Sequence, residues 1–282
     1  MLSSPGLEPI DYLVIGHLTQ DLTPDGPRLG GTAGYAARTA YAMGLRVGIV
    51  TAWGQEAQTD LLDGIKIVSE FSDHSTTFEN IEGEFGRIQR LHFIAPELDF
   101  YHIPGIWRDA PIVHIAPVVH EVNPLIARHF PDALTLLTPQ GWLRQWDESG
   151  KVDCAEWPEA RLALEQVTVT ILSDEDLQCD QLRIEDYVHA AKILIVTHGE
   201  NGATLYFEGQ EHLLDAPKVE VVDPTGAGDV FAAAFIGQYY AKRDPLEAAH
   251  FANQVAANSV TRSGLAGAPS EEDLYDITAE VN

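Results

Sequence analysis

Seven residues near the C-terminal end, DPTGAGD at 223–229, combine two glycines with a terminal carboxylate and stand directly before an apolar run. Val230, Phe231 and Phe235 follow at helical spacing, which predicts that a helix begins beside Asp229. The first amides of a helix lack intrahelical partners and carry partial positive charge. Glycines leave these amides accessible to an anion. The turn is therefore predicted to bind a negatively charged group.

The chemistry that suits such a turn is phosphoryl transfer onto an alcohol. The chain has no G-x-x-x-x-G-K-[ST] phosphate loop and no G-x-G-x-x-G after its first strand, so backbone amides and a divalent cation would neutralise the phosphate. Asp229 is placed to take a proton from an attacking hydroxyl. An amide cradle beside a carboxylate favours this reaction. The alternative is structural: Asp229 caps the helix and the glycines only shape the turn.

The elements that position these residues are predicted to be the strands and helices of a mainly parallel sheet. The first strand, helix, strand unit consists of a buried strand at 12–15, a helix that ends at Gly44 and a strand at 47–50. The helical spacing is that of Ala33, Ala36, Ala37, Ala40 and Tyr41. Further apolar runs without polar alternation lie at 111–119, 133–138, 167–172 and 192–197. Val219, Val221 and Val222 are expected to end the strand before the turn. We therefore predict one domain over 1–282, an α/β fold with a doubly wound, mainly parallel sheet.

Two polar segments interrupt this rhythm. Residues 75–95 are typical of two strands joined by a glycine-containing turn at 83–86, and the segment from His17 to Gly31 is similarly polar. Together they predict a small β lid, with segments at about 17–31 and 72–104. A plain surface hairpin is the alternative.

Composition excludes several classes of function. The formal net charge of the 282-residue chain is -26, which argues against nucleic acid and anionic membrane surfaces as partners. No apolar run is long enough to span a membrane and no signal peptide is recognisable, so we expect a cytoplasmic protein. Cys154 and Cys179 form no disulfide framework. Histidine spacing typical of zinc enzymes and the G-x-S-x-G motif of hydrolases are absent.

The chain resembles the ribokinase-like, or PfkB, carbohydrate kinases. DPTGAGDVFAAAF is similar to the C-terminal signature of that family, and GGTAGYAARTAYAMGLRVGIV to its N-terminal one. IVTHGENGATLY resembles the T-x-G-x-x-G nucleotide segment, and PLEAAHFANQVAANSVTRSGL the helix that flanks the adenine. The order and spacing of these segments run across nearly the whole chain. The resemblance implies the ribokinase-like fold with its β lid.

The resemblance also implies a role for individual residues. Asp229 would be the catalytic base. The amides of Gly226, Ala227 and Gly228 would form the anion hole for the transferring group. The implied nucleotide site consists of Thr197, Gly199, Gly202, Asn253 and Ser173. On the acceptor side, Asp21 would bind the sugar, and Gly30 and Gly31 would let the substrate lie against the backbone. Asp223 and Thr225 stand where some members hold a monovalent cation such as K⁺.

Two departures from the family pattern, and one similarity to a branch of the family, concern the substrate and the metal. Tyr35 occupies a position where the family often has an asparagine that binds a sugar hydroxyl, so the resemblance implies that Tyr35 is a substrate-binding residue. The N-x-x-E motif, which organises Mg²⁺ through water, appears as SDED, with Ser173 and Asp176 at the two motif positions. Gln140 and Arg144 form a Q-x-x-x-R element similar to that of the inositol-kinase-like branch, which implies that Arg144 contacts substrate.

The expected function is transfer of the γ-phosphoryl group of ATP, with Mg²⁺, to a hydroxyl of a small sugar, an inositol-like polyol or a nucleoside. The alternative is a catalytically retired kinase fold that binds sugar or nucleotide as a regulatory protein, which the departures at Tyr35 and SDED favour. Some relatives pair through the lid sheet, so the resemblance allows a homodimer through the lid.

Overall fold

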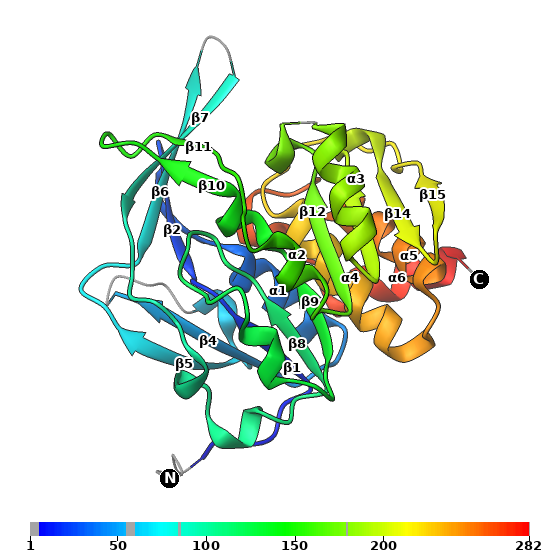
Figure 1. Ribbon diagram of the computed structural model, residues 1–282, viewed down its shortest axis with the longest axis horizontal. Helices are drawn as coiled ribbons and strands as arrows, with labels where there is room; N and C mark the ends of the chain where they lie inside the picture. Colours follow the sequence, from blue (N-terminus) through cyan, green and yellow to red (C-terminus); the bar gives the residue numbers. More distant parts are fainter. Residues whose placement is uncertain (1–5, 55–59, 84–85, 179, 282) are drawn as a thin grey trace.

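The structure, a computed structural model, describes residues 6–54, 60–83, 86–178 and 180–281. Within these residues the largest element is a nine-stranded sheet with the order β15-β14-β13-β12-β9-β8-β1-β4-β5 (Figure 1). Its strands are β1 Tyr12–Ile15, β4 Val47–Trp53, β5 Lys66–Phe71, β8 Ile112–Ile115, β9 Leu134–Leu137, β12 Val169–Ser173, β13 Ile193–Thr197, β14 Ala203–Phe207 and β15 Gln210–Leu214. Neighbours from β5 to β13 pair in parallel, whereas β14 and β15 are antiparallel. The predicted doubly wound, mainly parallel sheet is confirmed.

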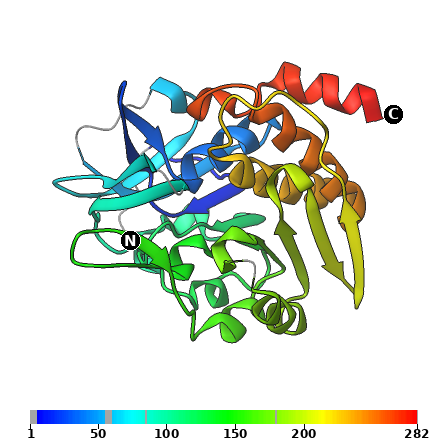
Figure 2. The ribbon, with the colours of Figure 1, turned by 90° about the horizontal axis from the view of Figure 1, so that it is seen from above.

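Helices cover both faces of the sheet (Figure 2). One face carries α1 Thr32–Ala42, α4 Ala227–Lys242, α5 Pro245–Ser259 and α6 Glu271–Val281, and the other α2 Ala160–Leu164 and α3 Gln181–Ala190. Two buried apolar clusters, one on each face, explain why the predicted strands lack polar alternation. Helix α4 packs against α1, α5 and the sheet, so its residues from Val230 to Gly237 are buried on all sides.

The segment before α4 differs from the prediction. Residues 215–223 form no regular strand, and Val221 and Val222 are 54% and 62% exposed. The amides of Val222 and Asp223 both donate to the carbonyl of Val260, at 2.8 and 3.1 Å. The expectation that the valines end a sheet strand was therefore wrong, because this segment bonds to the end of α5 and not to the sheet.

A second sheet forms the lid. Its strands are β2 Thr19–Thr23, β3 Gly26–Gly30, β6 Thr76–Gly83 and β7 Gly86–Phe93, in the order β3-β2-β6-β7. The two polar segments of the sequence supply all four strands, so the prediction of a lid sheet is confirmed. Asp21 lies in register with Arg28 on β3 and with Phe78 on β6, which places these three side chains on one face of the lid.

A hairpin that the sequence did not predict docks on the lid. It consists of β10 Arg144–Trp146 and β11 Val152–Cys154 and lies against β7 (Figure 1). The amide of Leu91 donates to the carbonyl of Gly150 at 2.8 Å, and Arg90 and Lys151 form a β-bridge. Phe78, Leu91, Val118 and Val119 form a buried apolar cluster that Trp146 and Val152 of the hairpin join. We call this element, residues 144–154, the lid hairpin.

Two sequence expectations concern the remaining features. Among the described residues, no helix is both long and apolar enough to cross a membrane. Cys154 is a free thiol, and Cys179 lies outside the described residues.

Candidate active site

The carboxylate of Asp229 stands in the first turn of α4, where the sequence predicted it. Burial raises its pKa to about 7, partly offset by the hydroxyl of Thr32, which hydrogen-bonds to it, and by the positive charge of Arg144. The charges of Asp176 and Asp21 raise it further. A carboxyl with a pKa near neutrality can exchange a proton with a substrate at physiological pH.

The turn before α4 has the backbone that an anion cradle requires. Gly226 is the N-cap of α4, with φ 80° and ψ 0°, a left-handed conformation that favours glycine. The amide of Ala227 donates to the carbonyl of Pro224 at 3.2 Å, so the turn itself already uses it. A Cβ built on Gly228 would meet nothing within 4 Å, which leaves open space beside a first-turn amide.

Four side chains from separate parts of the chain shift the pKa of Asp229. Asp21 comes from the lid strand β2, Thr32 from the start of α1, Arg144 from the lid hairpin and Asp176 from the turn after β12. Arg144 donates to the carbonyl of Val118 at 3.0 Å and lies 5.4 Å from the centre of the Phe78 ring. The lid and its hairpin thus bring Asp21 and Arg144 close enough to influence Asp229.

Asp176 is held by the protein through both carboxylate oxygens. Gln140, in the 3₁₀ helix Pro139–Leu143, donates its amide to Oδ1 at 3.2 Å, and the backbone amide of Ser173 donates to Oδ2 at 3.2 Å. Burial raises the pKa of Asp176, although Arg144 and these two hydrogen bonds oppose the shift. Among the described residues, no three His, Cys, Asp or Glu side chains gather as a metal-binding cluster.

Further predicted residues lie at the carboxyl ends of β12 and β13. Ser173 and Thr197 are register partners there, the edge at which open α/β sheets bind ligands. Gly202 has φ 92°, and a Cβ there would lie 2.8 Å from the amide nitrogen of Ala216, so the turn after β13 requires glycine. Gly199 has φ 55° and faces open space.

His198, which the sequence reasoning did not single out, links two segments at this edge of the sheet. Its Nδ1 lies 2.8 Å from Asp174 Oδ2 and its Nε2 2.8 Å from Thr204 Oγ1, so it joins the SDED segment to β14. Its position between Thr197 and Gly199 was the only available signal.

Asn253 holds the backbone that flanks this edge. It lies on α5, is only 7% exposed, and donates its side-chain amide to the carbonyl of Asp215 at 2.8 Å. The segment from Asp215 to Asp223 is thereby tied to α5 at its start, while Val260 holds its end.

On the acceptor side, Asp21 and the glycine pair pack closely. A Cβ on Gly30 would lie 2.8 Å from Cγ of Asp21, and a Cβ on Gly31, the N-cap of α1, would lie 2.6 Å from the carbonyl oxygen of His17. The backbone therefore requires glycine at residue 31, whereas a side chain at residue 30 would displace the carboxylate of Asp21. Tyr35 is 3% exposed and packs against Gly226.

Asp223 joins the cradle turn to the lid. Its Oδ1 accepts the amide of Thr225 at 2.9 Å, and its Oδ2 accepts the amide of Gly264 at 2.8 Å and the hydroxyl of Ser263 at 3.3 Å. Although burial raises the pKa of Asp223, these hydrogen bonds bring it below its usual value. Arg28 of β3 donates to the same Ser263 hydroxyl at 2.9 Å.

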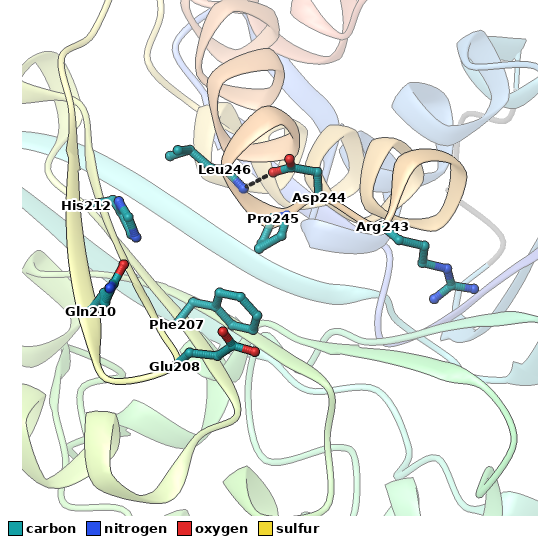
Figure 3. Close-up of a pocket in the computed structure, with 8 residues that line it drawn as sticks. All are labelled: Phe207, Glu208, Gln210, His212, Arg243, Asp244, Pro245 and Leu246. Atoms are coloured by element: carbon teal, nitrogen blue, oxygen red, sulfur yellow. Dashed lines mark hydrogen bonds between the residues drawn. The ribbon is translucent and has the colours of Figure 1, made fainter.

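A separate hollow of about 360 Å³ lies away from these residues (Figure 3). The end of β14 and β15 lines one side, with Phe207 and His212, and the turn between α4 and α5 lines the other, with Arg243. Arg243 directly follows the last residue of α4, so the whole helix, roughly 20 Å at about 1.5 Å per residue, separates this hollow from Asp229. It is not part of the catalytic site.

Comparisons with known proteins place part of the sequence in a kinase family and find kinases among its relatives. Residues 153–272 match the family described as pfkB family carbohydrate kinase. The chain is 28% identical over 265 residues to a cytidine kinase of Thermococcus kodakarensis, covering 84% of this chain and 91% of that one.

Solved structures share the fold over almost the whole chain. A pyrophosphate-dependent kinase in the ribokinase family, complexed with a pyrophosphate analog and myo-inositol, has a TM-score of 0.79 at 21% identity, over 94% of this chain and 99% of that one. The ribokinase of Arabidopsis thaliana complexed with ribose and ATP has a TM-score of 0.73 at 16% identity, over 96% and 99%.

These matches support a phosphotransferase of the kinase class. Residues 153–272 carry the match to the pfkB family of carbohydrate kinases, and the chain has the ribokinase-like fold.

Proposed function

We propose that the protein transfers the γ-phosphoryl group of ATP to a hydroxyl of a small sugar, an inositol-like polyol or a nucleoside. The observation that carries the proposal is the first turn of α4, where Asp229, with a pKa near 7, stands one residue from the open space at Gly228. A base and an anion site that close together suit an in-line attack of an alcohol on a phosphoryl group.

In this proposal Asp229 accepts the proton of the attacking hydroxyl. The Thr32 hydroxyl orients the carboxylate, and the guanidinium of Arg144 favours its ionised form, ready to accept a proton. The amides of Gly226, Ala227 and Gly228 stabilise the negative charge of the transferring group, with Ala227 exchanging its bond to Pro224 for the phosphoryl oxygen.

The residues at the edge of the sheet fit a nucleotide and its metal. Mg²⁺ usually binds through one or two carboxylates and substrate phosphates, and a single carboxylate that is held rigidly, as Asp176 is, fits that donor set. Mg²⁺ bound there through water would neutralise phosphate charge. Thr197, Gly199, Gly202 and Ser173 line the nucleotide side, and Asn253 fixes the segment beside the base. Asp223 and Thr225 are proposed for a monovalent cation such as K⁺.

On the acceptor side we propose that Asp21 and Arg144 bind substrate hydroxyls, beside the backbone at Gly30 and Gly31. Asp21 reaches the site from the lid, so an acceptor that bonds to it brings lid and base together. The relatives named above act on a nucleoside or bind an inositol, which supports trying both classes of acceptor.

The proposal is tested by screening phosphoryl transfer against sugars, inositols and nucleosides, with ³¹P NMR to detect the product and Asp229→Asn as the control. One acceptor class should give a phosphate ester whose formation the control abolishes. Because the comparison includes a pyrophosphate-dependent kinase, pyrophosphate is assayed beside ATP. Nucleotide binding without any transfer would instead indicate a retired kinase fold.

A further inference from the structure

The turn that precedes α4 rests on an aromatic ring from another helix. A Cβ built on Gly226 would lie 2.6 Å from Cγ of Tyr35 and still closer to its Cδ1 and Cε1 atoms. Real Cβ atoms do not approach carbon atoms this closely, so the ring occupies the place of a side chain at residue 226. Residue 226 must therefore be glycine for two reasons: its φ is 80°, and the ring of Tyr35 leaves no room for a side chain.

Tyr35 is built into the protein and is not free to move. It lies on α1, is 3% exposed, and belongs to the apolar cluster that α1 and α4 share. Burial raises the pKa of its hydroxyl well above the usual range, and the charges of Asp21, Asp229 and Asp223 raise it further. The hydroxyl thus stays protonated among the carboxylates of the site.

The same two helices meet a second time at the base. Thr32 lies three residues before Tyr35 on α1, and its side chain hydrogen-bonds to Asp229. Asp229 lies three residues after Gly226, at the start of α4. Helix α1 therefore supports both the turn and the carboxylate, through a ring and a hydroxyl on one helix face, since residues three apart are neighbours there.

We propose that Tyr35 is a positioning residue, whose ring fixes the Gly226 turn and through it the direction of the first-turn amides toward the phosphoryl group. The inference rests on the proposed function, because it concerns the same cradle. It differs from the substrate-binding role that the sequence suggested for Tyr35. A ring that acts through the turn should affect turnover, whereas a hydroxyl that binds the acceptor should affect the KM of the acceptor.

A double-mutant cycle between the two residues tests the contact without any assay of activity. Gly226→Ala, Tyr35→Ala and the double variant are compared by thermal unfolding. Gly44 supplies the control, because it has the same φ of 80° with nothing within 4 Å of its Cβ position. Gly226→Ala should lower Tm more than Gly44→Ala does. In the Tyr35→Ala background the Tm loss caused by Gly226→Ala should become smaller, whereas the loss caused by Gly44→Ala should stay the same. Additive Tm changes would overturn the contact.

Kinetics test the positioning role. Tyr35→Ala should lower kcat on the order of 100-fold, as misplaced reacting groups do, while the KM of the acceptor changes by less than about threefold. Tyr35→Phe, which keeps the ring, should recover most of that kcat. A raised acceptor KM in Tyr35→Phe, or a kcat that Tyr35→Ala leaves intact, would refute positioning. If the wild-type protein phosphorylates no acceptor, the proposed function fails. The double-mutant cycle measured by thermal unfolding still decides whether the ring of Tyr35 fixes the Gly226 turn.

Discussion

Replacing Asp229 by asparagine should stabilise the protein while it abolishes turnover. Burial raises the pKa of Asp229 from its ordinary 3.8 to about 7. The folded protein therefore holds this proton more tightly than the unfolded chain does, and ionising the group weakens the fold. The favourable contribution of the protonated carboxyl is complete below about pH 4 and is lost as the pH rises through about 7.

The magnitude follows from the two pKa values. At about 1.36 kcal/mol per pKa unit, the ionised carboxylate destabilises the folded state by up to roughly 4 kcal/mol above pH 7. Asparagine has nearly the same shape and cannot ionise. The variant should therefore exceed wild type in free energy of unfolding at pH 8 by a large part of that amount, and the difference should vanish near pH 4.

Urea unfolding at pH 4, 6 and 8, without nucleotide, measures the difference directly. Asp174→Asn is the matched control, because that carboxylate lies nearby and its partner is His198. In the same buffers, wild-type kcat/KM should fall about tenfold per pH unit below pH 7, since only ionised Asp229 accepts a proton. An asparagine variant that gains no stability over wild type between pH 4 and pH 8 would falsify the assignment of a base whose pKa is raised by burial.

Other perturbations address the remaining parts of the site. Gly228→Val should fold normally, because its Cβ position is open, and should weaken ATP binding at least about tenfold by calorimetry, because the side chain enters the anion space; unchanged affinity contradicts the cradle. Gln140→Leu removes one hydrogen bond to the carboxylate of Asp176 and should raise the Mg²⁺ concentration needed for half-maximal activity several-fold, roughly what such a loss gives. Gln145→Leu, at an exposed position, serves as the control, and equal effects of the two variants would contradict a Mg²⁺ role for Asp176. The true acceptor should slow hydrogen exchange in residues 75–95, measured by mass spectrometry, whereas a lid indifferent to substrate would show the same rates with and without it.

The sequence predicted the sheet and the start of the helix after Gly226 well, because both leave local signals. Apolar runs without alternation indicate strands covered on both faces, and the glycines before an apolar helix indicate an anion-binding helix start. The valines at 219–222 misled the same reasoning. Their composition is typical of a strand, yet Val260 accepts the hydrogen bonds that a neighbouring strand would have received.

Contacts between distant segments could not be predicted in this way. The lid hairpin consists of two three-residue strands with polar residues, too short to leave a periodic pattern. Nothing local relates Gln140 to Asp176, or Tyr35 to Gly226, because these pairs meet only after the chain has folded. The sequence identified several of the residues but not what each of them touches.

The lid hairpin has a mechanical consequence. Its turn is attached to β7 through the hydrogen bond between Gly150 and Leu91, while Sγ of Cys154, at the end of β11, lies 3.8 Å from the carbonyl oxygen of Glu175 beside Asp176. Arg144 begins the hairpin and rests on Phe78 of the lid. A movement of the lid relative to the main sheet would have to break these contacts or move the Arg144 guanidinium with it, and either change would alter the electrostatic environment of Asp229.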